Sequence, residues 1–183
     1  MSVSFLANKH DLELIFVEHQ ITHGGSMRYT IGHKNKNKID QSVFRQIDLE
    51  KKSGLHLEKS YLNFENKINT IKLDLVNLLN TLKSENKKVV GYAATSKSTT
   101  LINYFGITSE ILPVIYDTTP NKYNTFSPGA NIPIRPYSEF QASKPDYVLL
   151  FAWNHSKEIM LKEKEFMKNN RKWITYVPEV RIN

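Results

Sequence analysis

The stretch that decides the fold is Val89–Gly106, VVGYAATSKSTTLINYFG. An apolar run at its start stops at Gly91, a polar turn follows, and the remaining residues have the pattern of a helix. A strand that leads into a helix N-terminus directs backbone N–H groups and the positive end of the helix dipole at one place, which favours an anion. Lys97 lies in this turn, beside three hydroxyl residues, Ser96, Ser98 and Thr99. The stretch predicts a site for a phosphate-bearing ligand.

The composition is that of an ordinary globular protein. The chain has 183 residues, of which 40% are hydrophobic and 23% are charged, enough for one domain or one domain with an appendage. It contains no cysteine, which excludes disulfides and cysteine-ligated metals and fits a reducing cytoplasm. No apolar run has the length of a membrane span, and the first residues lack the order of a signal peptide. We therefore expect a cytoplasmic protein without a membrane partner.

The chain is basic, with a net charge of +7 and a pI near 9.4. A basic surface suits phosphorylated metabolites or nucleic acid. The densest basic run, His33–Lys38, is followed by Ile-Asp and is typical of a solvated loop. Nucleic acid is therefore not the partner that we expect.

The first part of the chain predicts a short helix over 3–9, a pair of strands and two further helices. Leu12–Glu18 and Ser26–Ile31 have strand patterns, and a turn with Gly24 and Gly25 joins them. Asp40 is a suitable N-cap for a helix over Gln41–Lys52.

A long helix over about 57–84 then carries apolar residues in heptad steps, at Tyr61, Phe64, Ile68, Ile71, Leu75, Leu78 and Leu82. The favoured interpretation is a helix that packs along its own domain. The alternative is a helix that bridges to another domain or to a second copy of the chain.

From about residue 86 onward, apolar strand patterns alternate with helix patterns. The expected segments are 88–92, 96–105, 111–116, a loop to 134, then 147–152, 155–168 and 173–177. Apolar strands separated by helices indicate a mostly parallel sheet with both faces covered. We therefore predict an α/β fold in three parts. These are a strand pair at 1–39, a helical connector at 40–85 and a Rossmann-like domain at 86–183.

Two known phosphate-binding patterns fit the stretch incompletely. Residues 91–98 match the P-loop except that Ser96 replaces its second glycine, and Asp117 after the next strand resembles a Walker B acid. A phosphate-dependent nucleotide triphosphatase is thus one alternative function. The dinucleotide fingerprint is absent, because Ala93 occupies its second glycine position.

Further polar or aromatic residues directly follow predicted strands, at positions that would line a shared crevice. Asp117 and Lys122 follow one predicted strand, and Trp153 and Asn154 follow another. The carboxyl ends of strands in an open α/β sheet are where ligands bind. An earlier cluster, residues 23–28, places Ser26 and Arg28 after a Gly-Gly turn.

No catalytic constellation is visible. The six histidines lack metal-ligand spacing, no G-x-S-x-G elbow is present, and no paired carboxylates bracket the predicted site. The residues alone therefore predict a binding domain with no catalytic residue and no metal ligand.

Taken together, the clusters resemble a known family. The chain is similar to the C-terminal region of S-adenosylmethionine-dependent C-methyltransferases that act on nucleotide-linked deoxysugars. Six segments carry the resemblance in family order: HGGSMR (23–28), 91–107, YDTTPNK (116–122), SPGANIPI (127–134), 145–159 and VPEV (177–180). One departure is Ala93, which replaces a usual glycine in the family's G-Y-G-A turn.

The resemblance implies that this chain binds a nucleoside diphosphate-sugar. In the family a preceding domain holds the methyl donor, an N-terminal segment binds zinc through cysteines, and a Glu-His pair serves deprotonation. The position that corresponds to Ser2 lies just after that pair. We therefore expect a C-terminal fragment, or a separate product that works with a methyl-donor subunit, and no binding of S-adenosylmethionine by this chain itself.

The residues and the resemblance agree on the ligand. Its pyrophosphate suits Lys97, Arg28 and the predicted helix N-terminus. Tyr92 or Trp153 is expected to stack on a base or a sugar face, and Asn103 lies beyond the first helical turn, where packing is its expected role. The predicted substrate-binding residues are Ser26, Arg28, Tyr92, Ser96, Lys97, Ser98, Thr99, Asn103, Asp117, Lys122, Trp153 and Asn154. The remaining alternative is an interaction protein that forms a homodimer through the helix at 61–82.

Overall fold

The computed structural model describes the backbone of residues 1–183 and every side chain except that of residue 169. The chain divides into two compact units, residues 1–66 and 67–183, and each is described by itself. The boundary falls inside α3 (Glu58–Ser84), within the segment that the sequence predicts as a helical connector.

The first unit contains an antiparallel strand pair with helices beside it. Its elements are α1 (Ser2–Asn8), β1 (Leu12–Gln20), η1 (Thr22–Gly24), β2 (Ser26–His33), α2 (Gln41–Lys52) and the start of α3. Asp40 caps α2 as predicted, because its Oδ1 accepts a hydrogen bond from the N–H of Ser42 at 2.8 Å. A small core of Leu14, Val17 and Val43 joins α2 to the strand pair.

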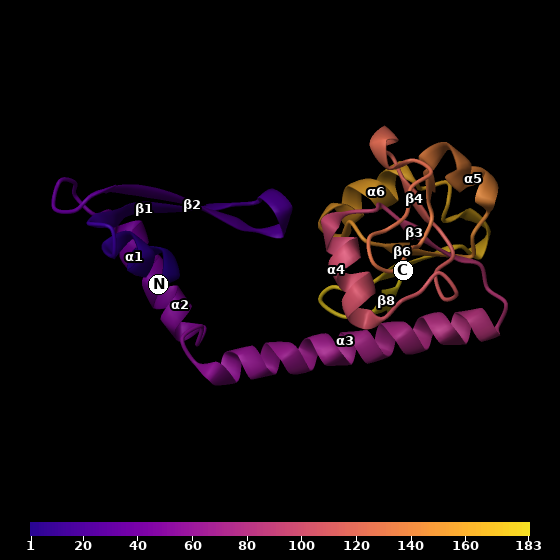
Figure 1. Ribbon diagram of the computed structural model, residues 1–183, viewed down its shortest axis with the longest axis horizontal. Helices are drawn as coiled ribbons and strands as arrows, with labels where there is room; N and C mark the ends of the chain where they lie inside the picture. Colours follow the sequence, from indigo (N-terminus) through magenta and orange to yellow (C-terminus); the bar gives the residue numbers. More distant parts are fainter. The chain divides into compact units, whose positions relative to one another are not determined.

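The second unit is an α/β sheet with helices on both faces (Figure 1). Its strands are β3 (Val89–Tyr92), β4 (Ile115–Asp117), β5 (Ile134–Pro136), β6 (Tyr147–Leu150), β7 (Lys172–Thr175) and β8 (Arg181–Ile182). Its helices after α3 are α4 (Ser96–Phe105), α5 (Phe140–Ser143) and α6 (Ser156–Lys162), and short 3-10 turns are η2 (Pro120–Lys122), η3 (Tyr137–Glu139), η4 (Trp153–His155) and η5 (Lys168–Asn170). The strand order is β5-β4-β3-β6-β7-β8, parallel except for β8. The predicted Rossmann-like, mostly parallel sheet is confirmed.

Side chains that alternate along each strand point to opposite faces of the sheet and contribute to two separate buried layers. On β3, Val89 belongs to the layer under α3 and α4, whereas Val90 and Tyr92 belong to the layer under α5 and α6. On β6, Leu149 and Leu150 divide in the same way. Because both faces are covered, the central strands β3 and β6 contain no charged residue, which is why the sequence shows short apolar runs there instead of polar alternation.

Some predicted elements are shorter than expected. The strand predicted at 111–116 begins at Ile115, because Thr108–Leu112 forms a turn and Pro113 has no N–H to donate. The helix predicted at 155–168 ends at Lys162, where Glu163 leaves helical geometry. The short elements β5, α5 and β8 were not predicted.

The heptad positions of α3 have two different environments. Leu75 and Leu82 are buried against the sheet of the second unit, with Ile68, Ile71 and Leu78 partly buried there. Tyr61 and Phe64 are 60% and 64% exposed. Most of the heptad face therefore packs on its own unit, and a homodimer through all of 61–82 would have to remove these side chains from the core. None of the described helices, α3 included, is long and apolar enough to cross a membrane.

Gly91 lies in the middle of the sheet, where no side chain fits. A Cβ built there would lie 2.8 Å from a ring carbon of Phe151 and 2.9 Å from Cγ1 of Ile115. Both neighbours are fully buried in the layer under α3 and α4. The glycine is therefore required for close packing of β3.

We expect Gly91→Ala to lower the free energy of unfolding by about 1–3 kcal/mol, because the added methyl group overpacks the core. The measurement is urea unfolding followed by circular dichroism. Gly106→Asn is the control, since a Cβ at Gly106 meets nothing and asparagine tolerates its left-handed backbone at φ 72°. Equal stability of Gly91→Ala and wild type would contradict the packing argument.

Candidate functional site

The centre of the sheet contains the point where the strand order reverses. From β3 the chain moves outward to β4 and β5, and then returns to β6 on the other side of β3. Open α/β sheets bind ligands in the crevice outside the carboxyl ends of the strands at such a point. Here those ends lead into Ala93–Thr95 after β3 and into Trp153 and Asn154 after β6.

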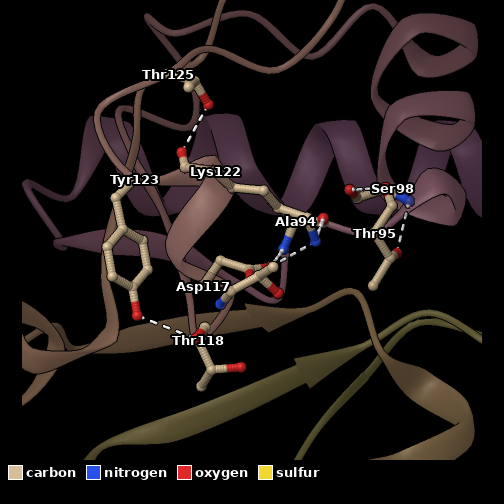
Figure 2. Close-up of polar contacts among 9 residues, drawn as sticks. Ala94, Thr95, Ser98, Asp117, Thr118, Lys122, Tyr123 and Thr125 are labelled. Atoms are coloured by element: carbon tan, nitrogen blue, oxygen red, sulfur yellow. Dashed lines mark hydrogen bonds and ion pairs between the residues drawn. The ribbon is translucent and has the colours of Figure 1, made fainter.

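The turn from β3 into α4 is tight and strained. Ala93 has φ 71°, the left-handed region that costs a residue with a Cβ roughly 1–2 kcal/mol. Its N–H donates to the carbonyl of Tyr116 at 2.8 Å, which fixes the turn to β4. Thr95 then caps α4, and its Oγ1 accepts from the N–H of Ser98 at 3.1 Å (Figure 2). Ser98 is itself buried and donates to the carbonyl of Thr95.

Asp117 holds this turn from the neighbouring strand end. Its buried carboxylate accepts from the N–H of Ala94 at 2.6 Å and from the N–H of Thr119 at 2.7 Å. Lys122 pairs with the same carboxylate at 3.4 Å and donates to the carbonyl of Ala94 at 2.7 Å (Figure 2). Asp117 and Lys122 are thus brought to the predicted site, where each is already engaged with the turn.

Lys97 lies in the first turn of α4 and reaches across to the end of β6. Its Nζ donates to Oδ1 of Asn154 at 2.9 Å and lies 5.2 Å from the ring centroid of Trp153. All three side chains are partly buried. The structure therefore brings together a cation, an amide and an aromatic ring at the reversal point. That they bind a ligand in one crevice stays a prediction.

A cavity of about 600 Å³ adjoins this cluster, between the first turns of α4 and the segment after β4. Its size is within the range of small-molecule sites. The described lining residues are Ala94, Thr95, Ser96, Ser98, Thr99, Thr100, Lys122, Thr125, Phe126, Ser127, Pro128 and Ile134. Ser96, Ser98, Thr99 and Lys122 of the predicted site thus line one cavity.

Asn103 connects α4 to the far wall of the cavity. Its Nδ2 donates to the carbonyl of Thr99 at 2.8 Å and to the carbonyl of Pro128 at 2.9 Å. Gly129 leaves room for this amide, since a Cβ there would collide with Oδ1 of Asn103. These bonds agree with the packing role that the residues indicated for Asn103.

The ligand-stacking role predicted for Tyr92 does not fit the structure. Its ring is only 4% exposed and packs edge-on against Tyr137, Phe140 and Trp173. Its hydroxyl donates to Oε1 of buried Glu163 at 2.9 Å. Burial, followed by the charge of Glu163 and the hydrogen bond to it, raises the pKa of Tyr92. The apolar pattern of β3 could not tell which sheet face this side chain occupies.

Ser26 and Arg28 lie on β2 of the first unit. Arg28 pairs with Glu18 on the adjacent strand at 3.0 Å, and Ser26 donates to the carbonyl of Thr22 at 3.2 Å. Both interactions are local to the strand pair. Participation of these two residues in one site with Lys97 stays a prediction.

The geometry is not that of a P-loop. Gly91 lies inside β3, and only Ala93–Thr95 connect the strand to α4. Such a short turn cannot wrap around a phosphate as a glycine-rich loop does. The Asp117 carboxylate is occupied by two backbone N–H groups and Lys122, which leaves it poorly placed to hold Mg²⁺. Among the described residues, no group of three potential metal ligands occurs.

Two features were missed at the sequence level. Phe126 is 61% exposed and lies in the lining of the cavity. It directly precedes the Pro- and Gly-containing segment 127–134, which carried part of the family resemblance, but the sequence did not predict Phe126 itself as a site residue. Glu163 is 1% exposed and accepts from Tyr92, Tyr137 and Gln141. Nothing in the local pattern around Glu163 distinguishes it from a surface glutamate.

An open parallel sheet with polar side chains at its reversal point defines a Rossmann-like domain with a candidate ligand crevice. The family model described as the C-methyltransferase C-terminal domain matches residues 21–178. The chain belongs to this family.

A curated relative is the C-methyltransferase NovU of Streptomyces niveus. It is 29% identical over 182 residues, which cover 99% of this chain and 43% of the relative. The chain thus spans less than half the length of that enzyme.

Tyr137 provides a test of the hydrogen bonds that Tyr92, Tyr137 and Gln141 donate to buried Glu163. Its hydroxyl donates to Oε1 of Glu163 at 2.6 Å, and burial together with this bond and the nearby charge raises its pKa from 10 to about 12. The neutral phenol is favoured in the folded state, so its contribution to stability is complete below pH 10 and is lost between pH 10 and 12. We expect urea midpoints to fall across this range, and less steeply in Tyr137→Phe.

Tyr104→Phe is the matched control, because Tyr104 is half-exposed on α4 and has no contact with Glu163 among its described interactions. It should keep the wild-type pH profile. An identical profile in wild type and Tyr137→Phe would rule out this role for Tyr137.

Proposed function

We propose that this chain is the substrate-binding C-terminal portion of an S-adenosylmethionine-dependent C-methyltransferase and that its substrate is a nucleoside diphosphate-sugar. The observation that carries the proposal is the Lys97 cluster, in which a cation lies at the N-terminus of α4 and contacts Asn154 and Trp153. The family membership supports the reaction class.

The cluster offers what a pyrophosphate needs. Lys97 supplies a positive charge. The first N–H groups of a helix have no acceptor within the helix, and of those in α4 the Ser98 N–H is already capped by Thr95, which lies before Ser96 and Lys97. The helix dipole adds a favourable field for an anion at the same end. A phosphate oxygen near Nζ of Lys97 would gain a charge-assisted hydrogen bond.

Of the two stacking groups predicted from the sequence, Trp153 is the one that the proposal keeps. It is partly buried, and the amine of Lys97 already lies over its ring, so one part of the ring is packed and another is accessible. A nucleotide base or a sugar face can pack on an indole of this kind. Asn154 beside it would then orient both Lys97 and the ligand.

In this proposal the chemistry belongs to other parts of the enzyme. A base removes a proton from the carbon next to a sugar keto group, and that carbon then receives the methyl group. The base and the donor site are expected from the domain that precedes this region in the family. This chain contributes the binding and orientation of the sugar nucleotide.

We expect the chain to bind dTDP in isothermal titration calorimetry and Lys97→Met to weaken that binding by roughly 10- to 100-fold. The reason is that a hydrogen bond to a charged group contributes about 1.5–3 kcal/mol. Methionine keeps most of the length of the side chain while it removes the charge.

Lys83→Met is the control, since Lys83 is an exposed residue in the last turn of α3 and carries the same charge. It should bind dTDP like the wild type. If both variants bind dTDP equally well, Lys97 is not part of the site, and if wild-type chain does not bind dTDP at all, the proposed function is wrong.

We also expect the chain alone to show neither methyl transfer nor binding of S-adenosylmethionine, because the donor site is proposed to lie in another domain. Calorimetry with S-adenosylmethionine and an assay with a labelled methyl group are the measurements. Micromolar affinity for the methyl donor would contradict this division of roles.

A further inference from the structure

The cavity beside α4 is chemically different from the Lys97 cluster. Lys97 is not among its described lining residues, although Thr95 and Ser96, which precede it in the chain, are. The cavity therefore adjoins the proposed phosphate position without including its cation. A ligand with its phosphate near Lys97 could place a neighbouring group in the cavity.

The cavity has no uncompensated charge among its described lining residues. Lys122 is the charged residue in that lining, and its amine pairs with the Asp117 carboxylate at 3.4 Å and donates to the Ala94 carbonyl at 2.7 Å. A second phosphate would find no free cation there. An uncharged group is the better match.

Hydroxyl-bearing side chains are interspersed with apolar surface in the lining of the cavity. The hydroxyl groups belong to Thr95, Ser96, Ser98, Thr99, Thr100, Thr125 and Ser127. Thr125 donates its proton to the carbonyl of Lys122 at 2.6 Å, which leaves its oxygen as an acceptor. Ser127 accepts from the N–H of Ile132 at 3.0 Å, which leaves its proton to donate. The wall thus presents both a fixed acceptor and a fixed donor, as a polyhydroxylated ring requires.

Phe126 adds an aromatic face to the lining. Its side chain is 61% exposed, whereas its backbone is held by a bridge to Pro133 and by flanking hydrogen bonds, from Ser127 to Ile132 at 2.8 Å and from Ile134 to Thr125 at 2.8 Å. The face of an aromatic ring is negative, and the C–H bonds on one face of a sugar ring are weakly positive. A sugar ring can therefore pack on Phe126 while its hydroxyl groups meet Thr125 and Ser127.

We propose that this cavity binds the uncharged sugar ring of the nucleotide sugar, with Phe126 as the platform for the ring and Thr125 and Ser127 as hydrogen-bonding partners. The inference rests on the proposed function, because it assigns one part of that ligand to one part of the site. It adds the prediction that the sugar increases the affinity of the ligand for the chain through its contact with Phe126.

The test compares dTDP with dTDP-glucose in calorimetry on the full 183-residue chain. Wild type should bind dTDP-glucose about tenfold more tightly than dTDP. Phe126→Ala should bind dTDP within about twofold of wild type and lose the gain from the sugar. Phe126→Tyr keeps an aromatic face and should retain most of that gain.

Several outcomes would overturn the inference. Equal binding of dTDP and dTDP-glucose by wild type would show that the sugar does not bind in the cavity. Equal weakening of both ligands in Phe126→Ala would assign Phe126 to the nucleotide. In both cases dTDP still binds and depends on Lys97, so the proposed function survives. Absence of dTDP binding in wild type would instead defeat the proposed function and this inference with it.

Discussion

The buried carboxylate of Asp117 is the interaction on which the site depends. It accepts from the N–H groups of Ala94 and Thr119 and pairs with Lys122, so it joins the end of β4 to the turn between β3 and α4. A buried N–H without a partner costs about 1–3 kcal/mol. Ala94 lies beyond the end of β3, and its N–H donates to the Asp117 carboxylate instead of to a neighbouring strand. The same contacts neutralise Lys122, so Asp117 also sets the charge of the adjoining cavity. One side chain thereby determines both the shape of the turn and the chemistry beside it.

The two lysines at this edge of the sheet show how the environment determines a role. Lys122 is held between a carboxylate and a backbone carbonyl, so its charge is balanced within the protein. Lys97 contacts a neutral amide and an aromatic ring, and neither carries a formal charge. A negative ligand is therefore attracted more strongly to Lys97. The proposed division between a phosphate position and an uncharged sugar position follows from this difference.

Much of the fold could be predicted from local patterns. The strand, turn and helix of Val89–Gly106, the Asp40 cap and the long helix α3 are signals that near neighbours in the chain decide. The short strands β5 and β8 depend on partners distant in sequence, so no local pattern marks them. Tyr92 shows the same limit for the site: its position at the strand end was predicted, but the sheet face that it occupies is fixed by Phe140 and Trp173.

The division of α3 between two compact units gives one helix two levels of local stability. Opening the turns that contain Leu75, Leu79 and Leu82 would expose side chains that are at most 3% accessible. Opening the turns around Tyr61 and Phe64 exposes little that is not already in solvent. Backbone amide protons near the start of the helix should therefore exchange with water much faster than those near its end. A single hydrogen-bonded helix can thus begin in one cooperative folding unit and end in another.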